Sequence, residues 1–325
     1  MLWLITGIVA AALFAALMAV VIKDIVVAKK KKVRYGVRES VSAYLLLAPA
    51  TILALIFVML PIVYSLGYAF TDYYLLEPDY MQFIGFENFI KIFESIGKQG
   101  MIYHAIINTL KFVVGVVPLQ IGLALGLALF VNNKRKGTGI FKVCYFAPVV
   151  ISLTITAQLW LQILSPSETG LLNSILGWFG VPPQDFIRNE EGAIWWIVLL
   201  SAWQGCGYQM LIFLSGLSNI RQDLYEAASL DGANKWQQFL HITVPALRST
   251  FLFIVITVFV GASRVMVQPM LMTDEKPHTI TISYWMYLEG YRYREVGYSA
   301  AMALLMTIVM GAITLVQRTV LREKD

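Results

Sequence analysis

Seven mainly apolar runs, each about twenty residues long, constrain the fold more than any other feature of the sequence. They cover residues 2–22, 43–66, 105–131, 141–164, 193–217, 246–272 and 296–317. A helix of this length crosses a bilayer with its backbone groups bonded internally. At 58% hydrophobic and 14% charged residues, the chain is also more apolar than a soluble domain. We therefore predict an all-α, polytopic membrane helix bundle of about seven transmembrane helices.

The basic residues predict an orientation for this bundle. Segments 23–42, 132–140, 218–245 and 318–325 hold fifteen Lys and Arg, whereas segments 67–104, 165–192 and 273–295 hold six. Because basic loops stay in the cytoplasm, the first set is predicted to be cytoplasmic, with the N-terminus outside and the C-terminus inside. The cluster Lys29–Lys32 is the strongest cue, and it could also contact anionic lipid.

The first run differs from a secretory signal peptide, because no basic residue precedes it and the basic cluster follows it. Residues 1–40 are therefore expected to form an extra transmembrane helix and a basic cytoplasmic linker. Residues 41–325 would form the main membrane domain. Prolines inside the second and third runs, such as Pro61 and Pro118, are compatible either with kinked packing or with helices that bend during function.

One predicted cytoplasmic loop, EAASLDGANKWQQFLHITVP, has the pattern of two short helices. Leu224–Leu230 favours a helix with Asp223 as its N-cap, and Asp231-Gly232 is a turn signal. Residues 233–240 favour a second helix with an apolar stripe, and Pro245 suits the first turn of the next membrane helix.

The chemistry of this loop suits docking. Ala227 and Ala228 allow close approach by another surface, and an arginine of a partner could bind the Glu226 carboxylate through two hydrogen bonds. A solvated loop without a partner is the alternative, but it leaves the exposed apolar stripe unexplained.

The same loop resembles the one shared by ABC importer permeases, in which Glu-Ala-Ala is followed after three residues by Gly and later by Ile and Pro. The matching residues are Glu226, Ala227, Ala228, Gly232, Ile242 and Pro245, while Asp231, Ala233 and Phe239 match the carbohydrate branch. Further similarity covers IGFENFIKIF (84–93), NTLKFVVGVVPLQIGLALGLAL (108–129), YQMLIFLSGLSNIRQDLYEAASLDGA (208–233) and VGYSAAMALLM (296–306). One departure is Arg221, where relatives often carry proline. The chain thus resembles the larger membrane subunits of binding-protein-dependent oligosaccharide importers of the maltose-transporter type.

This resemblance implies a multi-pass permease of the bacterial cytoplasmic membrane, with a six-helix core in residues 41–325. Its partners would be a second permease subunit in a heterodimer, two copies of a cytoplasmic ABC ATPase, an extracytoplasmic solute-binding protein and membrane lipid, with no nucleic acid. The ATPase-coupling residues would be Glu226, Ala227, Ala228, Asp231, Gly232, Ala233, Phe239 and Pro245. ATP and Mg would sit on the partner ATPases, since this chain carries no Gly-x-x-x-x-Gly-Lys-Ser/Thr string and is expected to bind no cofactor.

Polar side chains within the apolar runs are the candidates for substrate binding, because they are costly in a membrane. The fifth run carries Trp203, Gln204, Gly205 and Tyr208, which match a stretch lining the sugar site in maltose-type permeases. The sixth carries Arg264 and Gln268, predicted one turn apart on one helix face, and the fourth carries Gln158 and Trp160. Helix packing is the alternative for each of these residues.

Arg264 has no acidic partner in any predicted span. A guanidinium there could bind the hydroxyls of a neutral sugar, or the carboxylate or phosphate of an acidic saccharide or glycerophosphate-type substrate. A structural arginine that pairs with the second permease subunit is the alternative.

Two other classes of function fit less well. A membrane enzyme would need a catalytic set, but HExxH, GxSxG and paired intramembrane acids are missing from the sequence. Two cysteines and three scattered histidines give neither a disulfide framework nor a metal-ligand pattern. A non-enzymatic anchor or sensor would leave the docking loop without a purpose.

Overall fold

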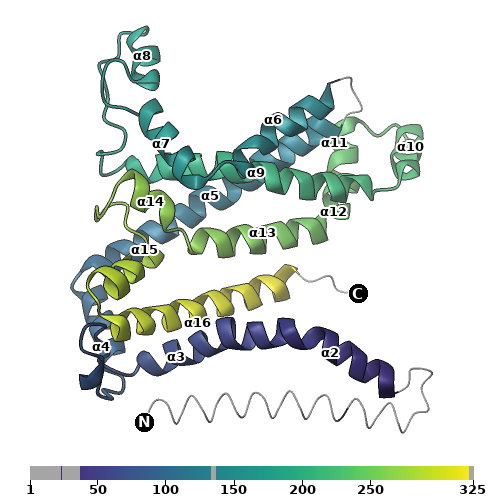
Figure 1. The fold of residues 1–325 in the computed structure, drawn as a ribbon. Helices are drawn as coiled ribbons and strands as arrows, with labels where there is room; N and C mark the ends of the chain where they lie inside the picture. The colour runs from purple at the N-terminus through teal and green to yellow at the C-terminus, as the bar shows by residue number, and fades with distance from the viewer. Residues whose placement is uncertain (1–22, 24–36, 133–136, 322–325) are drawn as a thin grey trace. The chain divides into compact units, whose positions relative to one another are not determined.

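The computed structural model describes residue 23, residues 37–132 and residues 137–321 (Figure 1). The extra helix predicted over residues 2–22 and most of the basic linker lie outside these described residues. The described chain forms two compact units, one of residues up to Lys91 with Glu289–Leu305, the other of Ile92–Leu288 with the residues from Met306 onward. Its regular elements are all helices, and its only extended pairings are two isolated bridges. The predicted all-α membrane fold is confirmed.

Four helical stretches are long and apolar enough to cross a membrane: Ser42–Tyr68, α5 (Met101–Asn132), α9 (Ala193–Ser218) and α16 (Val296–Leu321). The first consists of α2 (Val37–Ala54), a π-helical turn η1 (Leu55–Met59) and α3 (Leu60–Tyr68). Two bent pairs bring the described spans to as many as six. They are α6 (Thr138–Val150) with α7 (Leu153–Ile163), bent by 100°, and Lys235–Ala246 with α13 (Arg248–Ser263), bent by 66°.

Short helices make up the remaining regular structure. They are η2 (Pro78–Tyr80), α4 (Glu87–Gly97), α8 (Leu171–Gly177), α10 (Gln222–Leu230), α11 (Lys235–Gln238), η3 (Phe239–Thr243), α12 (Val244–Ala246), α14 (Val267–Met272), α15 (Ile282–Tyr287) and η4 (Leu288–Arg292).

The motif GFENF has a structural role in the first unit. Asn88 is buried, and its Nδ2 donates hydrogen bonds to the carbonyls of Ala69 at 3.1 Å and Thr71 at 2.8 Å. Gly85 adopts φ +61°, a left-handed conformation that suits glycine. The motif therefore fixes the chain where it leaves the first described span.

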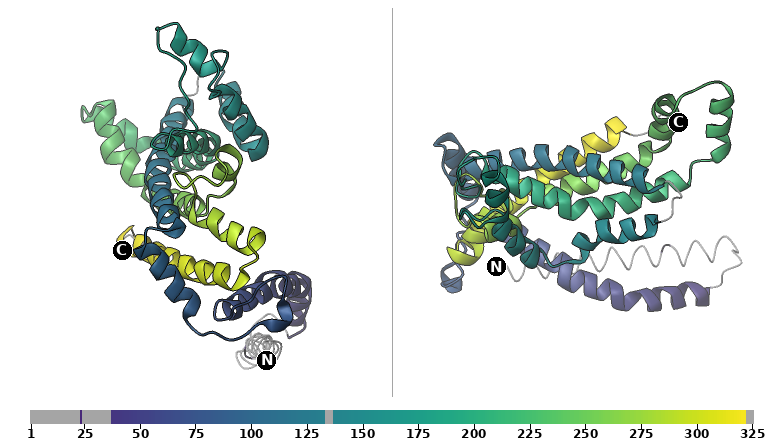
Figure 2. Two further views of the ribbon diagram at one scale, coloured as in Figure 1. Left: turned by 90° about the vertical axis from the view of Figure 1, so that its left-hand side faces the viewer. Right: turned by 90° about the horizontal axis from the view of Figure 1, so that it is seen from above.

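The helices α5, α6 and α9 pack together in the second unit, and Figure 2 shows α5 and α9 side by side. A Cβ atom on Gly207 would lie 2.3 Å from the carbonyl oxygen of Tyr145, so only glycine permits this approach of α9 to α6. The third predicted span is not interrupted, because α5 continues through Pro118. A Cβ on Gly122 would meet nothing within 4 Å, so this glycine is not required for packing.

Residues 246–272, expected as a single helix, form two. The helix α13 ends at Ser263 and α14 begins at Val267. Pro269 has no N–H to offer the carbonyl four residues earlier, at Val265. That carbonyl instead accepts a hydrogen bond of 2.6 Å from the Thr281 hydroxyl, so a side chain compensates for the break.

The fourth predicted span, residues 141–164, is also broken. Pro148 lies within α6, and the backbone is extended at Ile151 and Ser152, both with ψ 135°. The freed carbonyl of Ile151 accepts a hydrogen bond from Gln204 Nε2 at 3.3 Å. A side chain from α9 therefore holds the bend between α6 and α7.

The start of α5 is tied to the loop before α15. Asn108 is buried, and its Nδ2 donates to the carbonyls of Pro277 at 2.8 Å and Ile280 at 3.0 Å. The neighbouring Thr109 hydroxyl accepts the backbone N–H of Ile282 at 3.0 Å. These bonds join segments about 170 residues apart, so the Asn-Thr pair positions the chain that follows the break near Arg264.

Asn108→Ala is predicted to destabilise the protein by roughly 2 kcal/mol or more, because two carbonyls near the protein interior lose their donor. The measurement is the thermal denaturation midpoint of the protein purified in detergent. Asn132→Ala, at an exposed position where α5 ends, is the matched control and should leave the midpoint nearly unchanged. Equal midpoints for both variants would contradict this role of Asn108.

Candidate functional site

A central pocket of about 410 Å³ lies in the second unit, lined by α5, α9, α13 and the residues after α13. Four of the predicted substrate residues line it: Gln204, Gly205, Arg264 and Gln268. The pocket thus combines amides, a guanidinium and a glycine within a mostly apolar bundle, the usual composition of a small-molecule site.

Two further amides line the pocket and were not predicted. Gln120 Nε2 donates to Gln209 Oε1 at 3.0 Å, and both side chains are buried. A Cβ on Gly205 would lie 2.2 Å from Gln120 Nε2, so glycine at this position makes room for the amide pair. The sequence did contain a signal, since glutamine inside an apolar run is costly unless it is bonded. Its partner, 89 residues away, could not be read from the sequence.

Arg264 directly follows the last residue of α13 and is exposed to the pocket. Within the described residues its side chain has neither a hydrogen bond nor an ion pair, and the three ion pairs found there lie elsewhere. Its five N–H donors are therefore available to a ligand or a partner. Gln268 lies on α14, not one turn further along the same helix as predicted, because the break after Ser263 separates them. Both residues still line one pocket.

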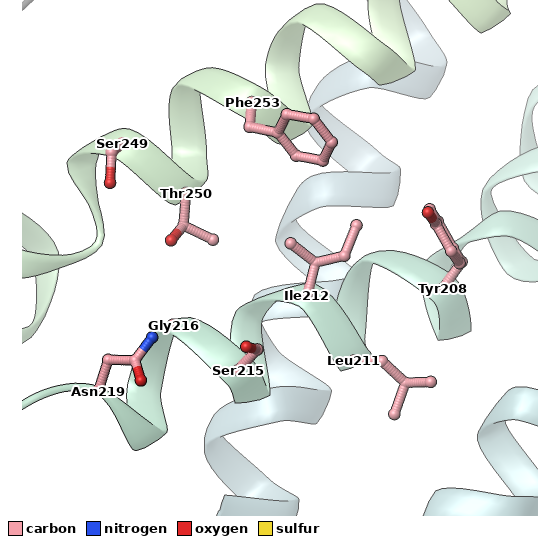
Figure 3. A pocket seen from close by; sticks show the side chains of 9 residues that line it. All are labelled: Tyr208, Leu211, Ile212, Ser215, Gly216, Asn219, Ser249, Thr250 and Phe253. Atoms are coloured by element: carbon pink, nitrogen blue, oxygen red, sulfur yellow. The ribbon is translucent and has the colours of Figure 1, made fainter. Parts of the chain in front are cut away.

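The other predicted substrate residues lie outside the central pocket. Trp203 and Trp160 contact each other, with ring centroids 6.0 Å apart. Gln158 lines a separate shallow site with Gln162. Tyr208 lines a groove nearer the end of α9 (Figure 3). The structure therefore gathers half of the eight predicted residues in one place.

The predicted docking loop projects from the end of the second unit where α9 ends and α13 begins (Figures 1 and 2). Gly232 ends α10 with φ +82°, and the N–H groups of Gly232 and Ala233 bond back to Ser229 and Ala228. This is a Schellman motif, in which glycine takes the left-handed position. The next helix starts with a capping box between Asn234 and Gln237.

The two helices of the loop differ in detail from the prediction. The first begins at Gln222, so Asp223 lies in its first turn and is not the N-cap; its side chain pairs with Arg221. The second α-helix is shorter than residues 233–240, because a π-helical turn replaces it from Phe239. Pro245 does lie in the first turn of a helix, but that helix is α12, which bends before α13.

Side-chain hydrogen bonds tie the two parts of the loop together, and sequence reasoning missed them. The Tyr225 and Thr243 hydroxyls are 2.8 Å apart. Gln238 is buried, and its Nε2 donates to Ser229 Oγ at 2.9 Å and to the Ala233 carbonyl at 3.1 Å. We call these bonds the brace. They make α10 one body with the helical segment that leads into α13.

The remaining surface of the loop is open. Glu226, Ala227 and Asp231 are exposed, Leu230 is 90% exposed and Trp236 is 65% exposed. Phe239 is half-buried under Trp236, with ring centroids 5.4 Å apart. An acid, a small residue and large apolar side chains thus share the loop surface, a composition that suits a protein interface.

A charged pocket of about 550 Å³ lies at the other end of the second unit, lined by Arg188, Glu190, Asp274, Lys276 and His278 among others. Burial lowers the pKa of His278, while the nearby Glu190 acts in the opposite direction. Several aromatic side chains in the loops are exposed as well, notably Trp178, Phe179 and Tyr291.

Comparison with known proteins identifies this architecture. Residues 8–324 match the family described as binding-protein-dependent transport system inner membrane component. The chain belongs to this family. The permease is accordingly a multi-pass membrane transport subunit and not an enzyme, as predicted.

Two relatives illustrate the match. The permease is 32% identical over 282 residues to the arabinooligosaccharides transport system permease protein AraP of Bacillus subtilis (strain 168), covering 86% of this chain and 88% of that one. It is 27% identical to the trehalose/maltose transport system permease protein MalF of Thermococcus litoralis, covering 88% of this chain and 94% of that one. The predicted likeness to ABC importer permeases of the carbohydrate type is confirmed.

The fold also matches a solved structure. A chain in the crystal structure of a bacterial ABC transporter involved in the import of the acidic polysaccharide alginate superimposes with a TM-score of 0.77 at 24% identity. The match covers 88% of this chain and 96% of that chain.

Gly205→Ala is predicted to destabilise the permease by roughly 1 to 3 kcal/mol, because the added methyl collides with the bonded Gln120 amide. The control is Gly122→Ala in α5, where the added methyl meets nothing within 4 Å. That change should be neutral or stabilising by up to about 1 kcal/mol through helix propensity. Thermal denaturation of the two variants in detergent measures the contrast, and a Gly205→Ala variant as stable as the parent would contradict the packing of this pocket.

Proposed function

We propose that the permease forms the membrane pathway of an ATP-driven carbohydrate importer, with the central pocket as its saccharide site and the α10–α11 loop as its ATPase dock. The observation that carries this proposal is the loop: Glu226 and Ala227 are exposed on a helix that the brace fixes to the segment before α13. A loop built in this way transmits movement, because it has a free contact surface and a rigid connection to a span.

Membership of the binding-protein-dependent transport family supports the proposed partners. Two ABC ATPases would bind ATP and Mg and would associate more closely with each other when ATP is bound. One of them would contact α10 through Glu226. A second permease subunit would complete the pathway in a heterodimer, and an extracytoplasmic solute-binding protein would deliver the sugar. The docking loop would then face the cytoplasm of a bacterium, with the N-terminus outside and the C-terminus inside, as the distribution of basic residues favours.

A neutral oligosaccharide is the leading substrate class. The central pocket offers the amides of Gln204 and Gln268 and the guanidinium of Arg264, all of which bond sugar hydroxyls. Relatives named for arabinooligosaccharides and for trehalose and maltose support the same class.

An acidic saccharide is the second candidate, and one observation favours it. The Arg264 guanidinium lines the pocket without an ion-pair partner among the described residues. An unpaired cation within a membrane bundle binds a carboxylate or phosphate more strongly than a hydroxyl.

Glu226→Lys is predicted to lower ATP-dependent uptake at least about tenfold, because reversing one charge of a buried interfacial pair costs roughly 2 to 5 kcal/mol. Uptake and co-purification of the ATPase are the two measurements. Glu168→Lys, at another exposed loop position, is the control and should change neither. A Glu226→Lys complex that retains its ATPase and transports normally would refute the docking role.

Substitution of Arg264 separates the two substrate classes. Arg264→Gln keeps donors for hydroxyls but loses the charge, so uptake of a uronate-bearing oligosaccharide should fall about tenfold or more while uptake of a neutral one persists. The measurement is uptake of matched neutral and uronate trisaccharides by the complete transporter. Equal losses for both sugars, with Arg264→Ala behaving in the same way, would instead assign Arg264 a structural role.

A further inference from the structure

A second groove, of about 480 Å³, lies between α9 and α13 nearer the docking loop (Figure 3). Tyr208 and Ile212 of α9 and Thr250 and Phe253 of α13 point into the space between the two helices. Asn219, which immediately follows α9, lies at the end nearest α10. We call this space the loop-side groove.

The loop-side groove and the central pocket lie along the same α9–α13 interface, which we call the seam. On α9 the pocket is lined by residues from Ser201 to Gln209, and the groove by residues from Tyr208 to Asn219. On α13 the pocket is lined by Gly261, and the groove by residues from Ser249 to Phe253. A substrate leaving the pocket toward the docking loop would therefore meet the groove next.

The polar side chains of the groove have no bonding partners among the described residues. Serine and threonine within helices commonly bond the carbonyl of the preceding turn, as Ser201 does with Ile197 and Thr257 with Phe253. Among the described residues, by contrast, the side chains of Tyr208, Ser215, Asn219, Ser249 and Thr250 have no hydrogen-bond partner, although all five line the groove. Their donors and acceptors are therefore available to a ligand.

A glycine in α9 allows α9 and α13 to approach each other closely within the groove. A Cβ on Gly216 would lie 2.8 Å from both Leu247 Cδ2 and Thr250 Oγ1, so α9 and α13 approach closely at this point. The rings of Tyr208 and Phe253 are each about half exposed, at 52%. The groove thus offers aromatic faces beside a row of hydroxyls and an amide. A sugar ring has the complementary surfaces, with apolar C–H faces and polar hydroxyls at its rim.

We propose that the loop-side groove is a second saccharide station, which holds a sugar unit after it leaves the central pocket and before it is released on the side of the docking loop. A lipid chain would leave the five polar groups unbonded, and so would an apolar helix face of a partner subunit. The station rests on the proposed sugar transport function, and of the residues that line it the likeness to known permeases had predicted only Tyr208.

Protection from alkylation tests the station. The chain has two cysteines, Cys144 and Cys206, which are first replaced by serine and alanine. Ser249→Cys and Ser215→Cys then each place a thiol in the groove. Thr319→Cys, at an exposed position near the end of α16, is the matched control. The complete transporter in inside-out vesicles is treated with a membrane-impermeant maleimide. Labelling is measured with and without millimolar arabinotriose, maltotriose or a uronate trisaccharide.

At least one transported trisaccharide should slow labelling in the groove several-fold and leave Thr319→Cys unaffected. Adding Asn219→Ala should raise the half-protecting concentration roughly fivefold, the effect of one lost hydrogen bond. Gln162→Ala, at an exposed position outside both the central pocket and the groove, should leave it unchanged.

Two results would overturn the station. Labelling that no transported sugar slows would show that the groove binds no saccharide. Thiols that the maleimide fails to label both with and without sugar would show that a partner subunit fills the groove. Uptake of the same trisaccharides by the parent transporter is measured in parallel. It distinguishes a wrong assignment of the groove from a wrong assignment of the transported substrate. If none is taken up, the carbohydrate assignment fails and the station falls with it; if one is taken up without protection, only the station fails.

Discussion

The need to bond every backbone polar group inside a bilayer is the constraint on which the rest of this structure depends. An unbroken helix meets it without help, as α5 and α9 do. The fourth and sixth predicted spans do not, because proline and extended residues free their carbonyls. In each case a side chain from a distant segment bonds the freed group, Gln204 at Ile151 and Thr281 at Val265. The breaks are therefore stable parts of the fold.

These breaks also create the central pocket. The helix α13 ends just before Arg264, and α14 begins at Val267. The residues from Arg264 to Gln268 all line the pocket. An uninterrupted helix would have placed Arg264 and Gln268 on a single straight helix, with less enclosed space between them. Chain irregularity at membrane depth coincides with the polar lining, as expected where non-helical backbone borders a cavity. Gln204 serves both purposes, since it bonds the bend and lines the pocket.

The sequence predicted those features that depend on neighbouring residues. Apolar runs located the described spans, and the Glu-Ala-Ala pattern located the α10–α11 loop with its turn at Gly232. Features that join distant segments were missed: the Gln120–Gln209 pair, the bond from Thr281 to the broken span, and the bonds from Asn108 to the loop before α15. Periodicity does not reveal them, because each depends on which helices become neighbours. The same reason explains why Trp160 and Tyr208 fall outside the central pocket, although their residue types suited a sugar site.

The brace has a consequence for the conditions under which the permease can respond to its partner. Its bonds, from Tyr225 to Thr243 and from Gln238 to Ser229 and Ala233, involve only neutral groups. Mobile ions largely screen attraction between exposed charges that lie more than about 10 Å apart at moderate salt, but they have little effect on short bonds between uncharged groups. The link between α10 and the start of α13 is therefore insensitive to ionic strength, so added salt would leave the position of α10 relative to α13 unchanged.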